Sequence, residues 1–320
     1  MPDQPETSFS SRNSHEDVST KKINTDVVPR LKSLHFSQTT KPSKSAGPSF
    51  EKAGNNLRIS TEFHKHVCKV AWKHLACVDK PSIPHIEIEM KFGIIADKRT
   101  HHRIVPYNKP FIVQNRNGRL ISNVSEKTFS NFQELLHLKS NNISKRLRTV
   151  KQVQTHTKDS IYNCNNVSKV AKLTSWRCSE NLRDKEVKLT FIKKIRVKDF
   201  LIRYPQSSLD AKISISLEVP EYEKSAAFRN HSILQRVKNR YSYSFNDKVP
   251  LHLDLTKVTT TRRGSSRQST THEVEVEMDP IFKQTIFAND KEKFNEYMCL
   301  FLNTSDLIRK AAERNNMETA

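Results

Sequence analysis

Two stretches of the chain alternate strictly between apolar and charged side chains. In residues 86–93, Glu87, Glu89 and Lys91 share one face of an extended chain, because successive side chains of a β-strand point to opposite faces. A solvated polar face is the ordinary explanation for one such strand. A second row of carboxylates weakens the explanation by a solvated face, since like charges on strand faces repel one another unless cations lie between them. We call these two rows of glutamates the glutamate combs. The second comb, in residues 272–278, consists of Glu273, Glu275 and Glu277.

Repeated short runs with β-strand alternation fill residues 145–260 and are separated by Asn, Asp, Ser and Pro. Their polar faces carry cations together with acids. Taken singly, each is an ordinary solvated strand face. If the sheet closes with these faces inward, however, the charges neutralise one another and the apolar faces lie outside under helices. The polar positions are Lys194, Arg196, Lys212, Ser214, Ser216, Glu218, Arg236, Lys238, Arg240, His252, Asp254 and Thr256.

Apolar residues at helical spacing predict helices on both sides of these strands. Ser60 or Thr61 is available as the N-cap of the first helix. Residues 94–124 are expected to be irregular, with a strand around 111–113. The pattern therefore predicts an α+β fold in which an antiparallel sheet closes beneath helices. The predicted helices cover residues 59–78, a segment from Ser125 to about 136, a turn opened by Asp279-Pro280, and about 290–302 and 304–313.

The charge of the chain favours anionic ligands. Its 320 residues carry a formal net charge of +21, from 55 Lys and Arg against 34 Asp and Glu. Nucleic acid, nucleotides and polyphosphate are the natural candidates, and an acidic membrane surface is the weaker alternative. The five glycines cannot form a P-loop or a G-x-G-x-x-G turn, so phosphate binding must rely on side chains. Five cysteines without C-x-x-C spacing argue against a disulfide framework or a zinc site.

Composition divides the chain into two parts. Residues 1–56 are rich in Ser, Thr, Asn, Lys and Pro without a sustained period, so we expect a disordered basic tail. Residues 57–320 are expected to form the catalytic domain. No apolar run approaches the ~20 residues that cross a bilayer, and the N-terminus lacks a signal-peptide core. We therefore expect a soluble, intracellular protein with no membrane partner.

Five motifs follow one another in a characteristic order. They are residues 86–93, Lys212-x-Ser214-x-Ser216-x-Glu218, Arg236-x-Lys238-x-Arg240, Asp254-x-Thr256-Lys257 and Glu273-x-Glu275-x-Glu277. Over roughly residues 60–310 the chain thereby resembles the fungal metal-dependent RNA 5′-triphosphatases, which belong to the triphosphate tunnel metalloenzymes. The resemblance implies a closed eight-stranded antiparallel β-barrel that forms a hydrophilic tunnel.

The resemblance also implies roles for individual residues. Glu87, Glu89 and Glu277 are expected to bind Mg²⁺ or Mn²⁺, and oxygen-only ligands suit such hard cations. Glu218 resembles the carboxylate that orients the attacking water. By the same resemblance, the cations expected to hold the γ-phosphate are Arg177, Lys238 and Arg240, with Lys194, Lys212 and Arg236 nearby in the tunnel wall.

Further acidic and polar residues are expected to support the metal and the phosphate-binding cations. By similarity, Glu273 and Glu275 bind metal-bound waters and brace the cations. Asn163 stands where the family pattern has an Arg, which weakens the assignment of Asp159 to the tunnel. The remaining supporting residues are Asp254, Thr256 and Ser214.

The expected function is hydrolysis of the γ-phosphate of 5′-triphosphate RNA to a 5′-diphosphate end, with side activity on nucleoside triphosphates. An inorganic tri- or polyphosphatase or nucleotide phosphatase of the same fold is one alternative, and a non-enzymatic RNA-binding protein is another. The tail shows no Trp-rich peptide of the kind that docks on guanylyltransferase, which favours RNA processing other than mRNA capping. We expect a nuclear and cytoplasmic location. The oligomeric state stays open, with a homodimer as one option.

Overall fold

The computed structural model describes residues 61–104, 108–113, 118–143, 151–162, 174–222, 228, 231–244 and 250–317. The predicted tail and the departure at Asn163 lie outside these residues. No helix in the described part of the chain combines the length and the apolar character that crossing a membrane requires.

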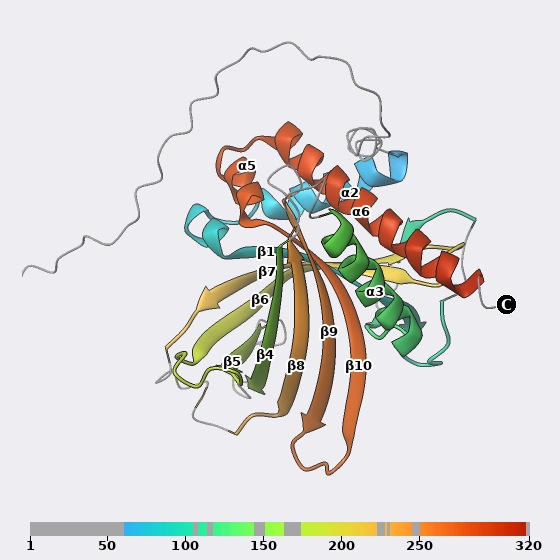
Figure 1. The fold of residues 1–320 in the computed structure, drawn as a ribbon. Coiled ribbons are helices and arrows are strands. Elements are labelled where there is room, and N and C mark those ends of the chain that lie inside the picture. The colour runs from blue at the N-terminus through green and yellow to red at the C-terminus, as the bar shows by residue number, and fades with distance from the viewer. Residues whose placement is uncertain are drawn as a thin grey trace, which may run out of the picture. The chain divides into compact units, whose positions relative to one another are not determined.

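Eight of the ten paired strands form a closed antiparallel barrel (Figure 1). Around the barrel their order is β1, β7, β6, β5, β4, β8, β9, β10 and back to β1. The prediction of a closed eight-stranded antiparallel barrel is confirmed. The strands are β1 (Ile86–Asp97), β4 (Lys151–Tyr162), β5 (Thr174–Asn181), β6 (Thr190–Arg203), β7 (Asp210–Pro220), β8 (Leu234–Ser244), β9 (Leu251–Arg262) and β10 (Gln268–Met278).

The pairing of β1 with β10 closes the barrel and joins the two glutamate combs. Glu89 lies opposite Glu277, and Lys91 lies opposite Glu275. On its other side β1 pairs with β7, which places Glu87 opposite Ser216. The two combs therefore lie on neighbouring strands of one concave surface.

The apolar faces of these strands lie outside and pack beneath helices. Ile88, Ile215 and Val276 are fully buried and belong to one core with Phe294 and Met298 of α6. Burial of each such side chain contributes roughly 1.5–3 kcal/mol. Figure 1 shows α3 and α6 beside β10, and both helices contact it. The helices are α2 (Glu62–Leu75), α3 (Glu126–Ile143), α5 (Lys283–Phe287) and α6 (Lys291–Met317), with 3₁₀ turns η1 (Lys80–His85) and η3 (Pro280–Phe282).

The helix starts follow the predicted caps. The Thr61 hydroxyl accepts a hydrogen bond from the His64 amide at 3.1 Å, and the Ser125 hydroxyl accepts one from the Thr128 amide at 3.1 Å. The Asp279 carboxylate caps η3 by accepting from the Ile281 amide at 3.1 Å. These side chains satisfy amide groups that have no partner within their own helix.

Several predicted helix boundaries were wrong. The first helix ends at Leu75 rather than at residue 78. The two helices predicted over about 290–302 and 304–313 are one helix, α6. The Thr304 hydroxyl donates to the Leu300 carbonyl at 2.9 Å, so it is satisfied within the helix and does not interrupt it.

The segment expected to be irregular also contains regular structure. β1 continues to Asp97 and pairs with β3 (Gly118–Ile121), while β2 (Phe111–Ile112) pairs with β6. Gly93 permits this extension, because a Cβ atom there would lie 2.1 Å from the carbonyl oxygen of Ile121. The backbones of two segments thus approach more closely than any larger residue would allow.

A candidate active site inside the barrel

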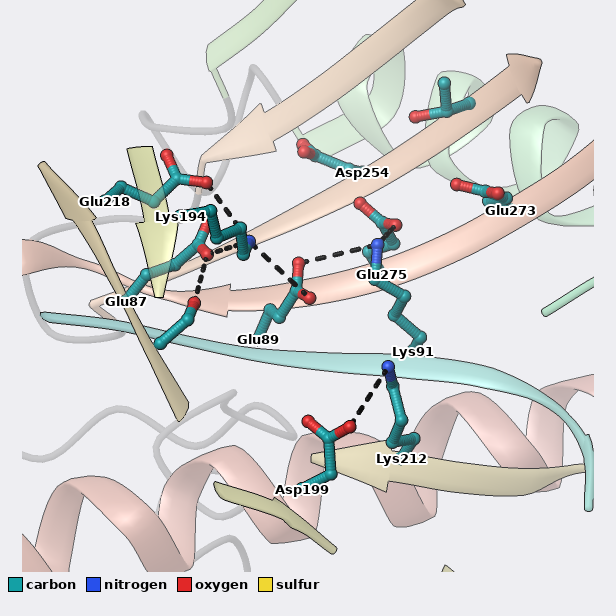
Figure 2. A network of polar contacts seen from close by, with 12 residues as sticks. Glu87, Glu89, Lys91, Lys194, Asp199, Lys212, Glu218, Asp254, Glu273 and Glu275 are labelled. Carbon is teal, nitrogen blue, oxygen red and sulfur yellow. Dashed lines mark hydrogen bonds and ion pairs between the residues drawn. The ribbon is translucent and has the colours of Figure 1, made fainter. Parts of the chain in front are cut away.

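The polar faces of the strands converge inside the barrel. Ion pairs there join strands that are not neighbours in the sheet, such as Lys194 of β6 with Glu87 of β1, and Arg177 of β5 with Glu218 of β7 at 3.2 Å. These side chains, two strands apart, meet because they share the concave inner face of the closed sheet. Figure 2 shows acids and lysines from several strands meeting in this interior.

Lys194 lies at the centre of one carboxylate group (Figure 2). Its ammonium pairs with Glu87 and lies 3.1 Å from Glu218 and 3.9 Å from Glu89. The Ser216 hydroxyl also donates to Glu87 at 3.0 Å. Burial acts to lower the pKa of Lys194, but the three carboxylates outweigh it and the pKa is raised. The lysine therefore stays charged and holds these acids together.

The opposite wall carries a cluster of cations. Lys238 pairs with Asp159, and Arg236 and Arg240 flank it on the same face of β8. Burial, together with these arginines and Arg177, lowers the pKa of Lys238 to about 8 despite the pull of Asp159. An anionic ligand would relieve this repulsion, which is the electrostatic character that a phosphate site needs.

Arg236 and Arg240 are held by carboxylates from other strands. Arg236 donates to Glu273 at 2.7 Å. Arg240 lies 2.8 Å from Asp254 and 3.6 Å from Glu275, and it donates to the Thr256 hydroxyl at 3.2 Å. The predicted bracing contacts of Glu273 and Glu275 with cations are present. Asp254 and Thr256 take part in the same arrangement.

Two glutamates of β10 have opposite surroundings. Glu275 is paired with Lys91 and lies near Arg240, and these cations hold its pKa far below the usual range although burial opposes them. Burial and the neighbouring charges of Glu87, Asp254 and Glu89 raise the pKa of Glu277 to about 8. No cation among the described residues forms an ion pair with Glu277. The end of β10 thus carries a carboxyl group whose ionised form is poorly stabilised by the residues around it.

The donor atoms at this end suit a hard divalent cation. Glu277, Glu87 and Glu89 offer only oxygen ligands, and a metal ion would supply the missing positive charge. The three side chains are not gathered around one point, since no group of three His, Cys, Asp or Glu in the described part of the chain is close enough to hold a metal ion. Glu87 instead bonds to Lys194 and Ser216. The residues fit a metal in chemistry and charge, and binding requires their side chains to rearrange.

Several inward-facing polar atoms have no hydrogen-bond partner within the described structure. They include the Ser214 hydroxyl, one oxygen each of Asp254 and Asp199, and the Arg177 Nε atom. Buried polar atoms ordinarily have partners. Such atoms in a polar interior are positioned to bind a polar ligand.

The comparisons with known proteins agree with this geometry. The sequence profile of the family described as mRNA capping enzyme, beta chain, matches residues 57–314. The chain belongs to this family. The RNA triphosphatase Pct1 of Schizosaccharomyces pombe has a similar structure, with a TM-score of 0.64 and 24% identity over 78% of this chain and 93% of Pct1. At this identity the likeness establishes the shared fold.

Two relatives show how the family varies. The chain is 73% identical to the protein named Polynucleotide 5′-triphosphatase CTL1 of Saccharomyces cerevisiae, over the full length of both. It is 28% identical to the mRNA-capping enzyme subunit beta of Candida glabrata, covering 74% of this chain but 40% of that subunit. The predicted family and the predicted enzyme class, a phosphohydrolase of the RNA 5′-triphosphatase type, are confirmed by these relationships.

The structure brings most of the predicted site residues into one interior. Among these residues, Lys212 has only a distant ion-pair partner: its ammonium lies 3.9 Å from the Asp199 carboxylate. Burial lowers the pKa of Lys212. Asp159, whose assignment was weakest, pairs with Lys238 and accepts from the Ser179 hydroxyl at 2.7 Å. It therefore lies within the cation cluster.

Sequence reasoning missed two participants. Lys91 was placed on the polar face of its strand but received no role, and it pairs with Glu275 and lies 3.5 Å from Glu89. Asp199 was missed entirely. The register of β6 shifts between Arg196 and Lys198, so Asp199 lies opposite Ser214 on the inner face. Alternation alone carries no signal for such a bulge.

Proposed function

We propose that this protein is a metal-dependent polynucleotide 5′-triphosphatase that removes the γ-phosphate from 5′-triphosphate RNA. The observation that carries the proposal is the meeting of a cation cluster with an undercompensated carboxylate inside a closed barrel. The cations offer a binding site for a polyanion, and Glu277 with its neighbours offers a site for the divalent ion that accompanies a triphosphate. The name of the 73% identical relative supports the same substrate class.

The proposed reaction is hydrolysis. A water oxygen forms a new bond to the γ-phosphorus while the bond from that phosphorus to the bridging β–γ oxygen breaks, giving orthophosphate, a 5′-diphosphate end and a proton released from the water. Phosphoryl transfer of this kind depends chiefly on positioning and on stabilisation of spreading negative charge. Lys238, Arg240 and Arg177 would supply that stabilisation, since they approach one interior space from β8 and β5.

Glu218 is proposed to orient the attacking water. Arg177 and Lys194 hold its carboxylate from two sides, at 3.2 Å and 3.1 Å. Burial acts against ionisation, but these cations keep its pKa below the usual value. The carboxylate is therefore ionised near neutral pH and can accept a hydrogen bond from water.

A divalent metal, Mg²⁺ or Mn²⁺, would supply Lewis-acid stabilisation of the γ-phosphate when bound. Glu87, Glu89 and Glu277 are proposed to hold it. Glu273 and Glu275 would keep Arg236, Arg240 and Lys91 aimed into the interior. Lys194, Lys212 and Ser214 complete the proposed wall of the site.

The decisive experiment measures phosphate released from γ-labelled triphosphate RNA, ATP and tripolyphosphate, with Mg²⁺ or Mn²⁺ and with EDTA. We expect metal-dependent release from RNA and slower release from ATP. Release from tripolyphosphate alone would point instead to an inorganic polyphosphatase of the same fold. RNA binding without release of phosphate from any substrate would contradict an enzymatic function.

A further inference from the structure

A cavity with polar and apolar lining lies at the other end of the barrel from Glu277. It has a volume of about 470 Å³ and is formed by the beginning of β8 and by the turn between β9 and β10. A pocket for an apolar ligand would be lined mainly by hydrophobic side chains. The polar lining residues here include His231, Ser232, Gln235, Arg262, Arg263 and Ser265.

The two arginines of this cavity are available for a ligand. Both are exposed, and neither forms an ion pair with any residue that the structure describes. The turn that carries them is ordered: the Arg263 amide donates to the Ile233 carbonyl at 3.1 Å, and the Ser265 amide donates to the Arg262 carbonyl at 3.1 Å. Gly264 provides the left-handed conformation of this turn, with φ of +75°. The cavity thus presents two uncompensated cations on a fixed backbone.

Part of the cavity belongs to the inner wall of the barrel, since Leu234 and Arg262 are paired on the inner face, whereas Gln235 and Thr261 are paired on the outer face. Arg236 of the cation cluster pairs with Thr260, and Arg262 is the next residue of β9 on the same face. Two residues along a strand span about 7 Å. A chain of phosphates that begins at Lys238 and Arg236 would therefore reach Arg262 at the end of β9, and Arg263 follows it in the turn outside the barrel.

The opposite end of the barrel has the reverse charge. Glu277 is next to the last residue of β10 and Glu87 is the second residue of β1. Lys283 lies near these acids, but its ammonium donates to the Pro84 carbonyl at 2.7 Å. Carboxylates repel a polyphosphate backbone, so the arginine end is the favourable exit.

We propose that the cavity around Arg262 and Arg263 binds the phosphodiester backbone of the RNA whose 5′-triphosphate lies in the barrel. This inference rests on the proposed function and adds to it the path of the RNA. Single-stranded nucleic acids bind to cationic grooves that follow their backbone, and such binding weakens with salt. The cavity would then favour RNA over free nucleotides, which have no phosphodiester linkage beyond the triphosphate for the arginines to bind.

The test compares the Arg262→Gln/Arg263→Gln variant with wild type on short triphosphate RNA and on ATP. We expect KM for RNA to rise roughly tenfold with kcat unchanged. The slope of log RNA affinity against log salt concentration should become shallower by about 1.4, since each of two lost phosphate contacts to a single strand contributes about 0.7. KM for ATP should not change. Arg267→Gln is the matched control, because Arg267 is exposed on the same turn but does not line the cavity.

Other results would overturn the inference. An unchanged KM for RNA, or equal changes with RNA and ATP, would exclude a specific contact with the RNA body. A rise in the RNA KM of Lys283→Gln but not of the double arginine variant would place the RNA at the carboxylate end. Fluorescence anisotropy of a labelled 5′-hydroxyl RNA measures binding of the RNA to the protein without turnover. Failure of the proposed activity can therefore be distinguished from failure of the cavity to bind RNA.

Discussion

Glu275 and Glu277 lie two residues apart on β10, and both face the barrel interior. Lys91 and Arg240 neutralise Glu275, whereas the charges around Glu277 are mainly those of other carboxylates. The alternation of the strand assigns both residues to the same face. What separates them is the set of side chains that reach them across the interior, so one glutamate braces cations while the other is suited to bind one.

The largest expected effect comes from Glu277→Gln. Because this change removes a proposed metal ligand, we expect phosphate release to fall by about 1,000-fold, a loss of roughly 4 kcal/mol of transition-state stabilisation. The stability should not fall near neutral pH, since Gln resembles the protonated carboxyl group that the raised pKa of Glu277 favours. Phosphate release and urea unfolding measure the two effects. Near-wild-type turnover would remove Glu277 from the metal site.

Glu275→Gln should instead reduce stability. It leaves Lys91 and Arg240 without their shared buried carboxylate, and breaking a buried pair costs about 3 kcal/mol or more. Urea unfolding of both proteins measures this difference. Glu62→Gln, which breaks an exposed pair with Lys65 on α2, serves as the control and should cause no resolvable change. Equal stability of the Glu275 and Glu277 variants would contradict the contrast between these residues.

Divalent metal should stabilise the wild type through Glu277. At a free metal concentration of 100 times Kd, the free energy of unfolding should rise by about 2.7 kcal/mol. Thermal unfolding with Mn²⁺ and with EDTA measures this gain independently of turnover. The gain should be absent in Glu277→Gln and kept in Glu62→Gln. A metal response that survives in Glu277→Gln would require a different set of ligands.

The smallest effect concerns the pH dependence of Lys238. Its pKa is lowered to about 8, so its ammonium is present below that pH and is lost above it. Since the proposed role needs the charge, kcat/KM should fall above pH 8 by up to about tenfold per pH unit. Lys238→Arg keeps a cation at higher pH and should move this decline upward. An identical decline in both proteins would exclude Lys238 as its cause.

Much of this arrangement could be predicted from local patterns. Alternation with a period of two placed Glu87, Glu89 and Lys91 on one face, and caps such as Ser125 marked the starts of helices. The pairing of Lys91 with Glu275 depends on the register between β1 and β10, which no local pattern encodes. Asp199 was hidden by the shift in β6, because one additional residue reverses the faces that follow.

The pairing of β1 with β10 has a consequence for how the enzyme is made. Glu89 and Glu277 meet only after almost the whole chain has left the ribosome, because β10 is the last strand. Contacts between such distant segments form slowly during folding. A nascent or shortened chain that lacks β10 can neither close the cylinder nor assemble the carboxylates, so the proposed catalyst stays inert until its synthesis is nearly finished.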